Sequence, residues 1–282
     1  MALVLGAGVL AGMVNTIVGA GTLITFPLLV ALGHPPLTAN VSNTVGLVPA
    51  SITGAWGYRR ELSGQWRTVA RMAALSAVGG IAGGLLLLVA PAEAFTAVVP
   101  WLLVLAAALA AVQPRVAALV RRRALAAREA TVGAAPVLSP TDVGTGPAET
   151  TPVTGPAAVG PITHPLTVGL ALGIAATGVY GGYFGAAQGV VLLALLGIAW
   201  TTDLHRANGA KNVLAGVANL VSAAVFIIGG IVDWRLAGLI ALGSGLGGVL
   251  GARVGRRIPA PLLRALIVVV ALAAAVLIWS NR

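Results

Sequence analysis

The chain matches itself when its second half is shifted against its first by 168 positions. The shift places these residues opposite one another: Gly21 and Gly189, Asn40 and Asn208, Trp66 and Trp234, Ser76 and Ser244, and Gly83 and Gly251. A match between scarce residues such as Trp or Asn is more informative than one between alanines. A duplicated unit in a very hydrophobic chain is typical of secondary transporters. The sequence therefore predicts two homologous units, 1–112 and 164–282.

The composition places these units in a membrane. Only 9% of the residues are charged and 58% are hydrophobic, whereas a soluble domain carries about 25% charged residues. The apolar runs are long and continuous, without the alternation of a β-barrel. We therefore expect an all-α polytopic membrane protein with 8–10 transmembrane helices, located in the bacterial inner membrane.

Each unit opens with a long apolar stretch that glycines interrupt, at Gly19-Ala20-Gly21 in the first and between Gly181 and Gly189 in the second. Such a stretch is long for one span of about 20 residues and short for two, so it predicts a broken or re-entrant first segment. Further spans are predicted at 38–57, 67–90, 94–112, 208–230, 235–254 and 261–279.

Residues 113–163 separate the two units. Arginines come first, and a stretch rich in Thr, Pro, Gly and Ala follows. Low hydrophobicity and frequent proline predict a flexible linker, which the arginines place on the cytoplasmic side. An interfacial helix at about 115–129 remains open.

The arginines in the short loops indicate the orientation of each unit, because cytoplasmic loops are enriched in Lys and Arg. Arg59 and Arg60 follow the 38–57 span, whereas the matched loop of the second unit has Ile227 and Ile228. The loop at Arg253 is basic, and its first-unit counterpart at 85–93 has no Lys or Arg. This exchange favours inverted repeats of five passes each. Eight spans in parallel repeats are the alternative.

The net charge of +10 fits membrane lipids as partners, because most arginines flank apolar runs where anionic headgroups lie. We expect no nucleic-acid partner. The acidic residues lie at span ends or in the linker, so none offers a hard ligand for a cation in mid-span. Cysteine is absent and no catalytic motif is present, so we expect no metal, no cofactor and no enzymatic activity.

Glycine-interrupted segments at equivalent places in two repeats are the best sequence indication of a transport site. A helix that restarts there presents free N–H groups and a positive dipole end, which favour an anion. The candidate binding residues are Asn15, Gly19, Gly21, Asn40, Asn43, Thr44, Gln188, Gly189, Asn208, Lys211 and Asn212. Helix packing by the glycines and interhelical hydrogen bonds by the asparagines are the alternative interpretation.

Lys211 is the only lysine of the chain and lies opposite Asn43 in the shifted alignment. A lysine in mid-span that faces lipid costs several kcal/mol. It should therefore face a cavity, pair with a carboxylate or extend to the interface.

Ordered motifs in both units resemble the sulfite exporter TauE/SafE family of membrane permeases. The first unit carries Gly12 to Gly21, then Phe26-Pro27-Leu28-Leu29, Leu32-Gly33, Ala39 to Thr44, Gly54, Tyr58-Arg59-Arg60 and Trp66-Arg67. The second carries Gly181 to Gly189, Ala207-Asn208 and Asp233-Trp234-Arg235. The chain departs from the family pattern in Gly19-Ala20-Gly21, where a longer glycine run is usual, and in Gln188.

The resemblance implies two homologous membrane halves that move a small sulfur-containing anion such as sulfite, thiosulfate or sulfoacetate. We expect alternating access around a site between the halves. A channel-like conductor is the nearest alternative, and an intramembrane enzyme is a further one. A small anionic solute is thus the expected partner besides lipid.

Overall fold

The computed structural model describes residues 1–133, 163–254 and 260–280. Helices account for nearly all of these residues. Their bounds are α1 Ala2–Ile17, α2 Thr22–Ala31, α3 Pro36–Gly57, α4 Trp66–Val89, α5 Ala92–Gly133, α6 Val168–Tyr183, α7 Gln188–Ala199, α8 Leu204–Ile228, α9 Trp234–Val254 and α10 Ala260–Ser280. The prediction of an all-α protein is confirmed for this part of the chain.

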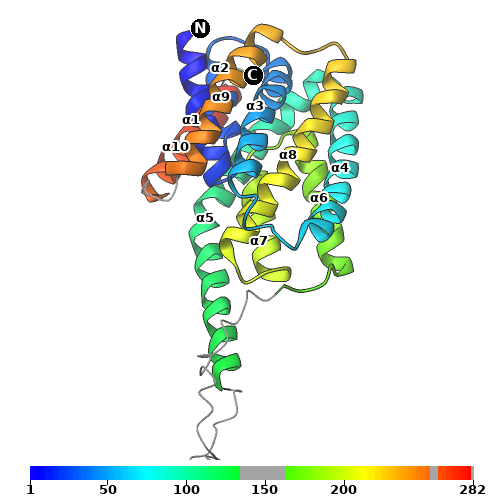
Figure 1. Cartoon of the computed structure of the whole chain (residues 1–282). Coiled ribbons are helices and arrows are strands. Elements are labelled where there is room, and N and C mark those ends of the chain that lie inside the picture. The colour runs from blue at the N-terminus through cyan, green and yellow to red at the C-terminus, as the bar shows by residue number, and fades with distance from the viewer. Residues whose placement is uncertain (134–162, 255–259, 281–282) are drawn as a thin grey trace, which may run out of the picture.

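The helices form a bundle in which segments from the two halves of the chain alternate (Figure 1). The helices α3 and α8 contact each other in its middle. On one side α9 packs against α1 and α3, and on the other α4 packs against α6 and α8. In Figure 1, α2 lies toward the upper end and α7 toward the lower end. Each half of the chain therefore completes the packing of the other.

Both opening segments are broken, as predicted. The first break separates α1 from α2 at residues 18–21, and the second separates α6 from α7 at 184–187. Gly181 and Gly182, which we expected at the second break, lie inside α6 instead. There Gly182 faces α4, where an added Cβ would lie 2.9 Å from the backbone nitrogen of Gly84. Close helix packing thus explains Gly182, and Gly181 leaves room for the side chain of Gln188, where an added Cβ would lie 2.2 Å from Nε2.

Local sequence signals explain where several helices begin. Pro36 is the first residue of α3, a position where its missing N–H costs nothing. Asp203 caps α8 by accepting hydrogen bonds from the N–H groups of His205 (2.8 Å) and Arg206 (3.3 Å). Asp233 caps α9 in the same way. Two of the acids at span ends are therefore helix caps.

Glycines on α4 and α9 allow close backbone contact with the opening helices. An added Cβ at Gly79 would overlap the carbonyl oxygen of Ala175 on α6. At Gly247 it would overlap that of Val9 on α1. Small residues at helix interfaces bring backbones together in this manner in membrane bundles. These glycines thus fix the α4–α6 and α9–α1 pairs.

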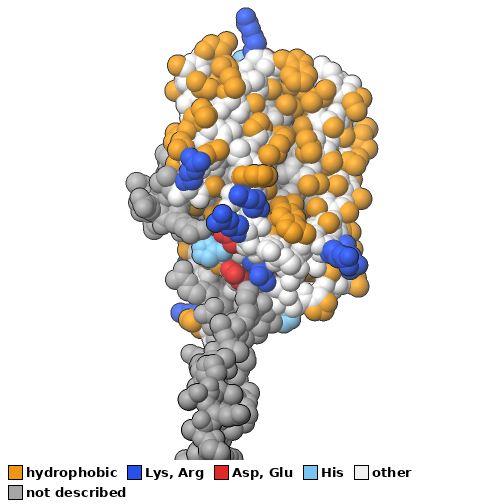
Figure 2. All heavy atoms as spheres, in the orientation of Figure 1, with side chains coloured by type: hydrophobic (Ala, Val, Ile, Leu, Met, Phe, Trp, Pro, Cys, Tyr) orange, Lys and Arg blue, Asp and Glu red, His pale blue; other side chains and the backbone are white. Residues whose placement is uncertain are grey.

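The surface of the bundle is apolar. Val78 on α4 and Leu246 on α9 are 66% and 63% exposed, and orange side chains cover most of the face in Figure 2. Among the described residues, four segments are long and apolar enough to cross a membrane: Trp66–Val89, Ala92–Leu119, Leu204–Ile228 and Trp234–Arg253. Shorter apolar helices such as α1, α2, α6 and α7 accompany them.

The helix α5 is longer than the fourth span that we expected. We placed the end of that span at residue 112, followed by a linker with an interfacial helix at about 115–129 left open. Instead α5 continues through Pro114 to Gly133, includes residues 115–129 and extends beyond the bundle (Figure 1). Residues 113–133 are rich in Ala and Arg, which favour helix even where hydrophobicity is low. A linker can therefore begin only after Gly133. The predicted linker residues 134–162 lie outside the described residues.

Candidate functional site

The two helix breaks meet in the interior. The backbone N–H of Gly189, at the start of α7, donates to the carbonyl oxygen of Gly19 at 3.1 Å. A Cβ added at Gly189 would lie 2.5 Å from the Cα of Gly19, so no larger residue fits there. Gly19 also has a φ of +81°, a conformation that only glycine adopts freely. Gly19 and Gly189, from opposite halves of the chain, therefore contact each other through backbone atoms alone.

Lys211 of α8 lies beside this contact and is 0% exposed. Its Nζ donates to the carbonyl oxygens of Asn15 (3.3 Å) and Thr16 (3.1 Å) in the last turn of α1. A Cβ added at Gly189 would lie 3.1 Å from its Cδ. The C-terminal end of a helix carries partial negative charge, which stabilises the ammonium. Of the three alternatives for Lys211, extension to the interface is wrong.

Asn43, the residue opposite Lys211 in the shifted alignment, contacts the other side of the same break. Its Nδ2 donates to Thr22 Oγ1 at 3.2 Å, and its Oδ1 accepts from the hydroxyl of Thr25. Both threonines belong to α2. Lys211 thus holds the end of α1, and Asn43 holds the start of α2.

Two further candidates complete the polar group at the end of α1. Asn15 Nδ2 donates to Ser51 Oγ at 3.3 Å, and Asn212 Nδ2 donates to the Thr16 carbonyl at 3.5 Å. The hydroxyl oxygen of Thr16 is buried without a hydrogen-bond partner. We call the group of Asn15, Thr16, Gly19, Gly189, Lys211 and Asn212 the junction.

Asn40 and Gln188 lie at the second break instead. Asn40 Nδ2 donates to the carbonyl of Tyr183, the last residue of α6, at 3.0 Å. Gln188 Nε2 donates to the carbonyl of Thr177 in α6 at 3.3 Å, so its side chain points back along α6. The Oδ1 atoms of Asn40 and Asn208 are buried without a partner. An unsatisfied buried acceptor costs about 1–3 kcal/mol, which favours a water or another donor at each position.

Two candidates have local roles. The hydroxyl of Thr44 donates to the carbonyl of Asn40 in its own helix at 2.9 Å. Gly21 faces α1, where an added Cβ would lie 2.9 Å from Asn15 Cβ. Sequence reasoning missed Thr25 and Ser51, although Thr22 and Thr25 have the i, i+3 spacing that places two side chains on one helix face.

A pocket of about 400 Å³ reaches the edge of the junction. Ser51 and Asn212 lie in its lining, and both hydrogen-bond to the junction. Arg59, Trp56 and Trp66 line it as well, near the ends of α3 and α4. This pocket therefore extends from the edge of the polar group to Arg59, and most of its lining is apolar. Within the described ranges no group of three His, Asp or Glu side chains could hold a metal ion.

Comparison with known proteins identifies the family. The family model described as "Sulfite exporter TauE/SafE" matches residues 4–278. The chain belongs to the TauE/SafE family. Because the match spans nearly the whole chain and the helices are apolar, this member of the family is a multi-pass membrane protein.

Curated relatives of this TauE/SafE protein are distant. The "Probable membrane transporter protein ORF9" of Sinorhizobium sp. is 24% identical over 276 residues, which cover 98% of this chain and 90% of the relative. The "Probable membrane transporter protein YfcA" of Escherichia coli (strain K12) is 24% identical over 272 residues, covering 93% and 82%. No solved structure matches the chain significantly.

Proposed function

We propose that this TauE/SafE protein is a membrane permease for a small anion, with a sulfur oxyanion or an organosulfonate as its substrate class. The single observation that carries the proposal is the buried Lys211 beside the contact of the two helix breaks. The family and the names of the two relatives agree with transport. We place the protein in the bacterial inner membrane.

The chemistry of the junction favours an anion. An ammonium has three N–H donors, and the Asn15 and Thr16 carbonyls accept two of those of Lys211. The third donor and the unpartnered Thr16 hydroxyl remain for a ligand. The first turns of α2 and α7 add positive dipole ends. The N–H groups of Leu23, Ile24, Gln188, Gly189 and Val190 already bond to backbone carbonyls, so they are not free donors as we expected. Sulfite, thiosulfate and sulfonates present the oxygen acceptors that the donors of Lys211 and Thr16 bind.

We further propose that the two halves are inverted repeats of five helices each. The Ser76 hydroxyl donates to the Leu214 carbonyl at 2.9 Å, and the Ser244 hydroxyl donates to the Gly46 carbonyl at 2.5 Å. Both members of one hydrogen bond lie 168 positions from those of the other, with the halves exchanged. A two-fold relation between the halves accounts for such an exchange.

Helix starts support the same relation. Two pairs of starts lie 166 positions apart and three lie 168 apart: Ala2 and Val168, Thr22 and Gln188; then Pro36 and Leu204, Trp66 and Trp234, Ala92 and Ala260. The difference falls in the second helix of each half, where α2 has 10 residues and α7 has 12. The uninterrupted shift of 168 therefore fits only from the third helix onward.

Contacts at the ends of α3 and α8 favour inversion over a parallel duplication. The start of α8 lies at the end of α3, because Arg206 Nε donates to the Glu61 carbonyl at 3.1 Å. The residue after α8 and before α9 lies at the start of α3, because the N–H of Asp233 donates to Ser42 Oγ at 3.0 Å. The matched helices α3 and α8 therefore run in opposite directions.

Alternating access follows from this arrangement. Gly19 and Gly189 touch through backbone atoms and one hydrogen bond. The side chains of Lys211 and Asn212 and the ring contact of Phe26 with Phe184 also join the two halves there. Relative movement of the halves would exchange these hydrogen bonds for others, and it would open the site to one side at a time. The pocket lined by Ser51 and Asn212 is the route from the arginine-bearing face.

Flux measurements in proteoliposomes test the proposed function. Radiolabelled sulfite, thiosulfate, sulfoacetate and chloride are supplied outside, with and without the same anion inside. A permease gives saturable uptake that internal substrate accelerates. Ohmic current without saturation would instead indicate a channel, and absence of flux for every anion would contradict the proposal.

A further inference from the structure

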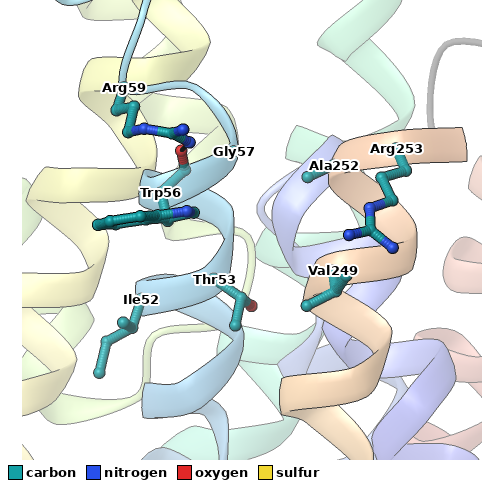
Figure 3. Close-up of a pocket in the computed structure, with 8 residues that line it drawn as sticks. All are labelled: Ile52, Thr53, Trp56, Gly57, Arg59, Val249, Ala252 and Arg253. Atoms are coloured by element: carbon teal, nitrogen blue, oxygen red, sulfur yellow. Dashed lines mark hydrogen bonds between the residues drawn. The ribbon is translucent and has the colours of Figure 1, made fainter.

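A second pocket lies between the C-terminal ends of α3 and α9 (Figure 3). It shares Ile52, Trp56 and Arg59 with the first pocket, but no junction residue lines it. Its volume is about 560 Å³. Its lining is Ile52, Thr53, Trp56, Gly57, Arg59, Val249, Ala252 and Arg253. Arg59 and Arg253 come from opposite sides of the pocket, and none of these eight residues is acidic. Two guanidinium groups thus face one space without a carboxylate in its lining.

Arg59 is held in place by its own helix end. Its Nη1 donates to the Trp56 carbonyl at 2.9 Å, and its Cζ lies 4.5 Å from the centroid of the Trp56 ring. A guanidinium has five N–H donors, so most of those of Arg59 remain available. The side chain of Arg253 extends along α9 toward Val249 in Figure 3 and lines the same pocket. This arrangement suits an oxyanion between the two arginines.

The opposite end of the pocket is apolar. Ile52 and Val249 lie about one to two helical turns before the arginines, and Ile52 is 60% exposed on the outside of the bundle. Trp56, 68% exposed, lies between the two ends, as tryptophan does at the boundary of a membrane. A ligand that fills the pocket is therefore anionic at one end and apolar at the other.

We propose that this pocket binds an anionic phospholipid, with its phosphate between Arg59 and Arg253 and an acyl chain along Ile52 and Val249. Basic pockets between membrane helices bind anionic headgroups in this way. A free inorganic anion would leave the apolar end without a partner. The lipid would join the ends of α3 and α9, which come from different halves of the chain.

Native mass spectrometry of the full chain in detergent tests the headgroup. Phosphatidylglycerol should bind, and phosphatidylcholine of the same chain length should bind much more weakly. Arg59→Gln and Arg253→Gln should each weaken phosphatidylglycerol binding about fivefold, which corresponds to about 1 kcal/mol per arginine near a membrane surface. Arg67→Gln, which removes an exposed arginine outside this pocket, is the matched control and should have no effect.

A second pair of variants tests the acyl chain. Val249→Trp fills the apolar end without changing the charge and should abolish lipid binding, whereas Leu250→Trp on the exposed neighbouring position should not. Equal loss in Arg67→Gln, or equal binding of phosphatidylcholine, would overturn the proposal. Unchanged binding in Val249→Trp together with displacement of the lipid by inorganic phosphate would also overturn it, in favour of a site for a free anion.

Discussion

A buried lysine is costly in a membrane unless its charge is balanced. The ammonium of Lys211 is balanced by two carbonyl groups at the end of α1, which a helix that continued past Ile17 would have used for its own hydrogen bonds. The break in the opening segment therefore makes the lysine possible. This dependence explains why a single charged side chain can lie fully buried among apolar helices.

The contact of Gly19 with Gly189 gives a prediction for one residue. Gly189→Ala should lower the free energy of unfolding by about 1–3 kcal/mol, because the new methyl group overlaps the Gly19 backbone. It should also reduce transport. Thermal unfolding in detergent and anion uptake measure the two effects.

Gly238→Ala is the matched control, because an added Cβ at Gly238 meets nothing within 4 Å and the residue is helical. That variant should be as stable as the wild type or slightly more stable. Equal stability of the two variants would contradict a close contact at Gly189.

Some residues near the first break were predicted from the sequence alone, and others were not. Asn43 and Lys211, which lie opposite one another in the repeat, contact the two helices that flank the first break, and their role in binding stays a prediction. Thr25 and Ser51 were missed because a single threonine or serine in an apolar run carries no signal of its own. Their role depends on which helix faces them, and that is a property of the packed bundle.

At the scale of helices, the exchanged hydrogen bonds of Ser76 and Ser244 give a second prediction. Ser76→Ala and Ser244→Ala should each lower the free energy of unfolding by about 0.5–1.5 kcal/mol, the net contribution of one buried hydrogen bond. The two losses should be equal, because each serine bonds to the matched carbonyl of the opposite half.

Thermal unfolding in detergent measures both serine variants. Ser63→Ala is the control, because Ser63 is exposed in the loop after α3. A loss at one serine only would contradict the equivalence of the two halves.

Composition and hydrophobicity predicted some features of the helices but not others. Glycines and hydrophobic runs predicted both broken segments and most spans within a few residues. They left a helix at 115–129 open, but they did not predict that it is continuous with the fourth span as α5, because low hydrophobicity was taken as the end of that span. Helix formation depends on the helix propensity of the residues, whereas membrane insertion depends on their hydrophobicity. A helix can therefore continue beyond the segment that lies in the membrane.

For the whole molecule, inversion predicts which loops share a face of the membrane. Single cysteines at Ser63 and Arg253 should react with a membrane-impermeant maleimide from the same side, and a cysteine at Gly230 should react from the other. The chain has no native cysteine, so the background is clean. Labelling of positions 63 and 253 from opposite sides would support parallel repeats and contradict the topology.

Anion uptake by Lys211 variants tests the central claim, that the junction binds the transported anion. Lys211→Asn installs the residue found at the matched position 43 and should lower the initial rate of uptake at least tenfold, since a charge-assisted hydrogen bond contributes about 1.5–3 kcal/mol. Lys211→Arg keeps the charge and should retain part of the activity, and size-exclusion chromatography shows that both variants are folded. Uptake by folded Lys211→Asn at the wild-type rate would contradict the account.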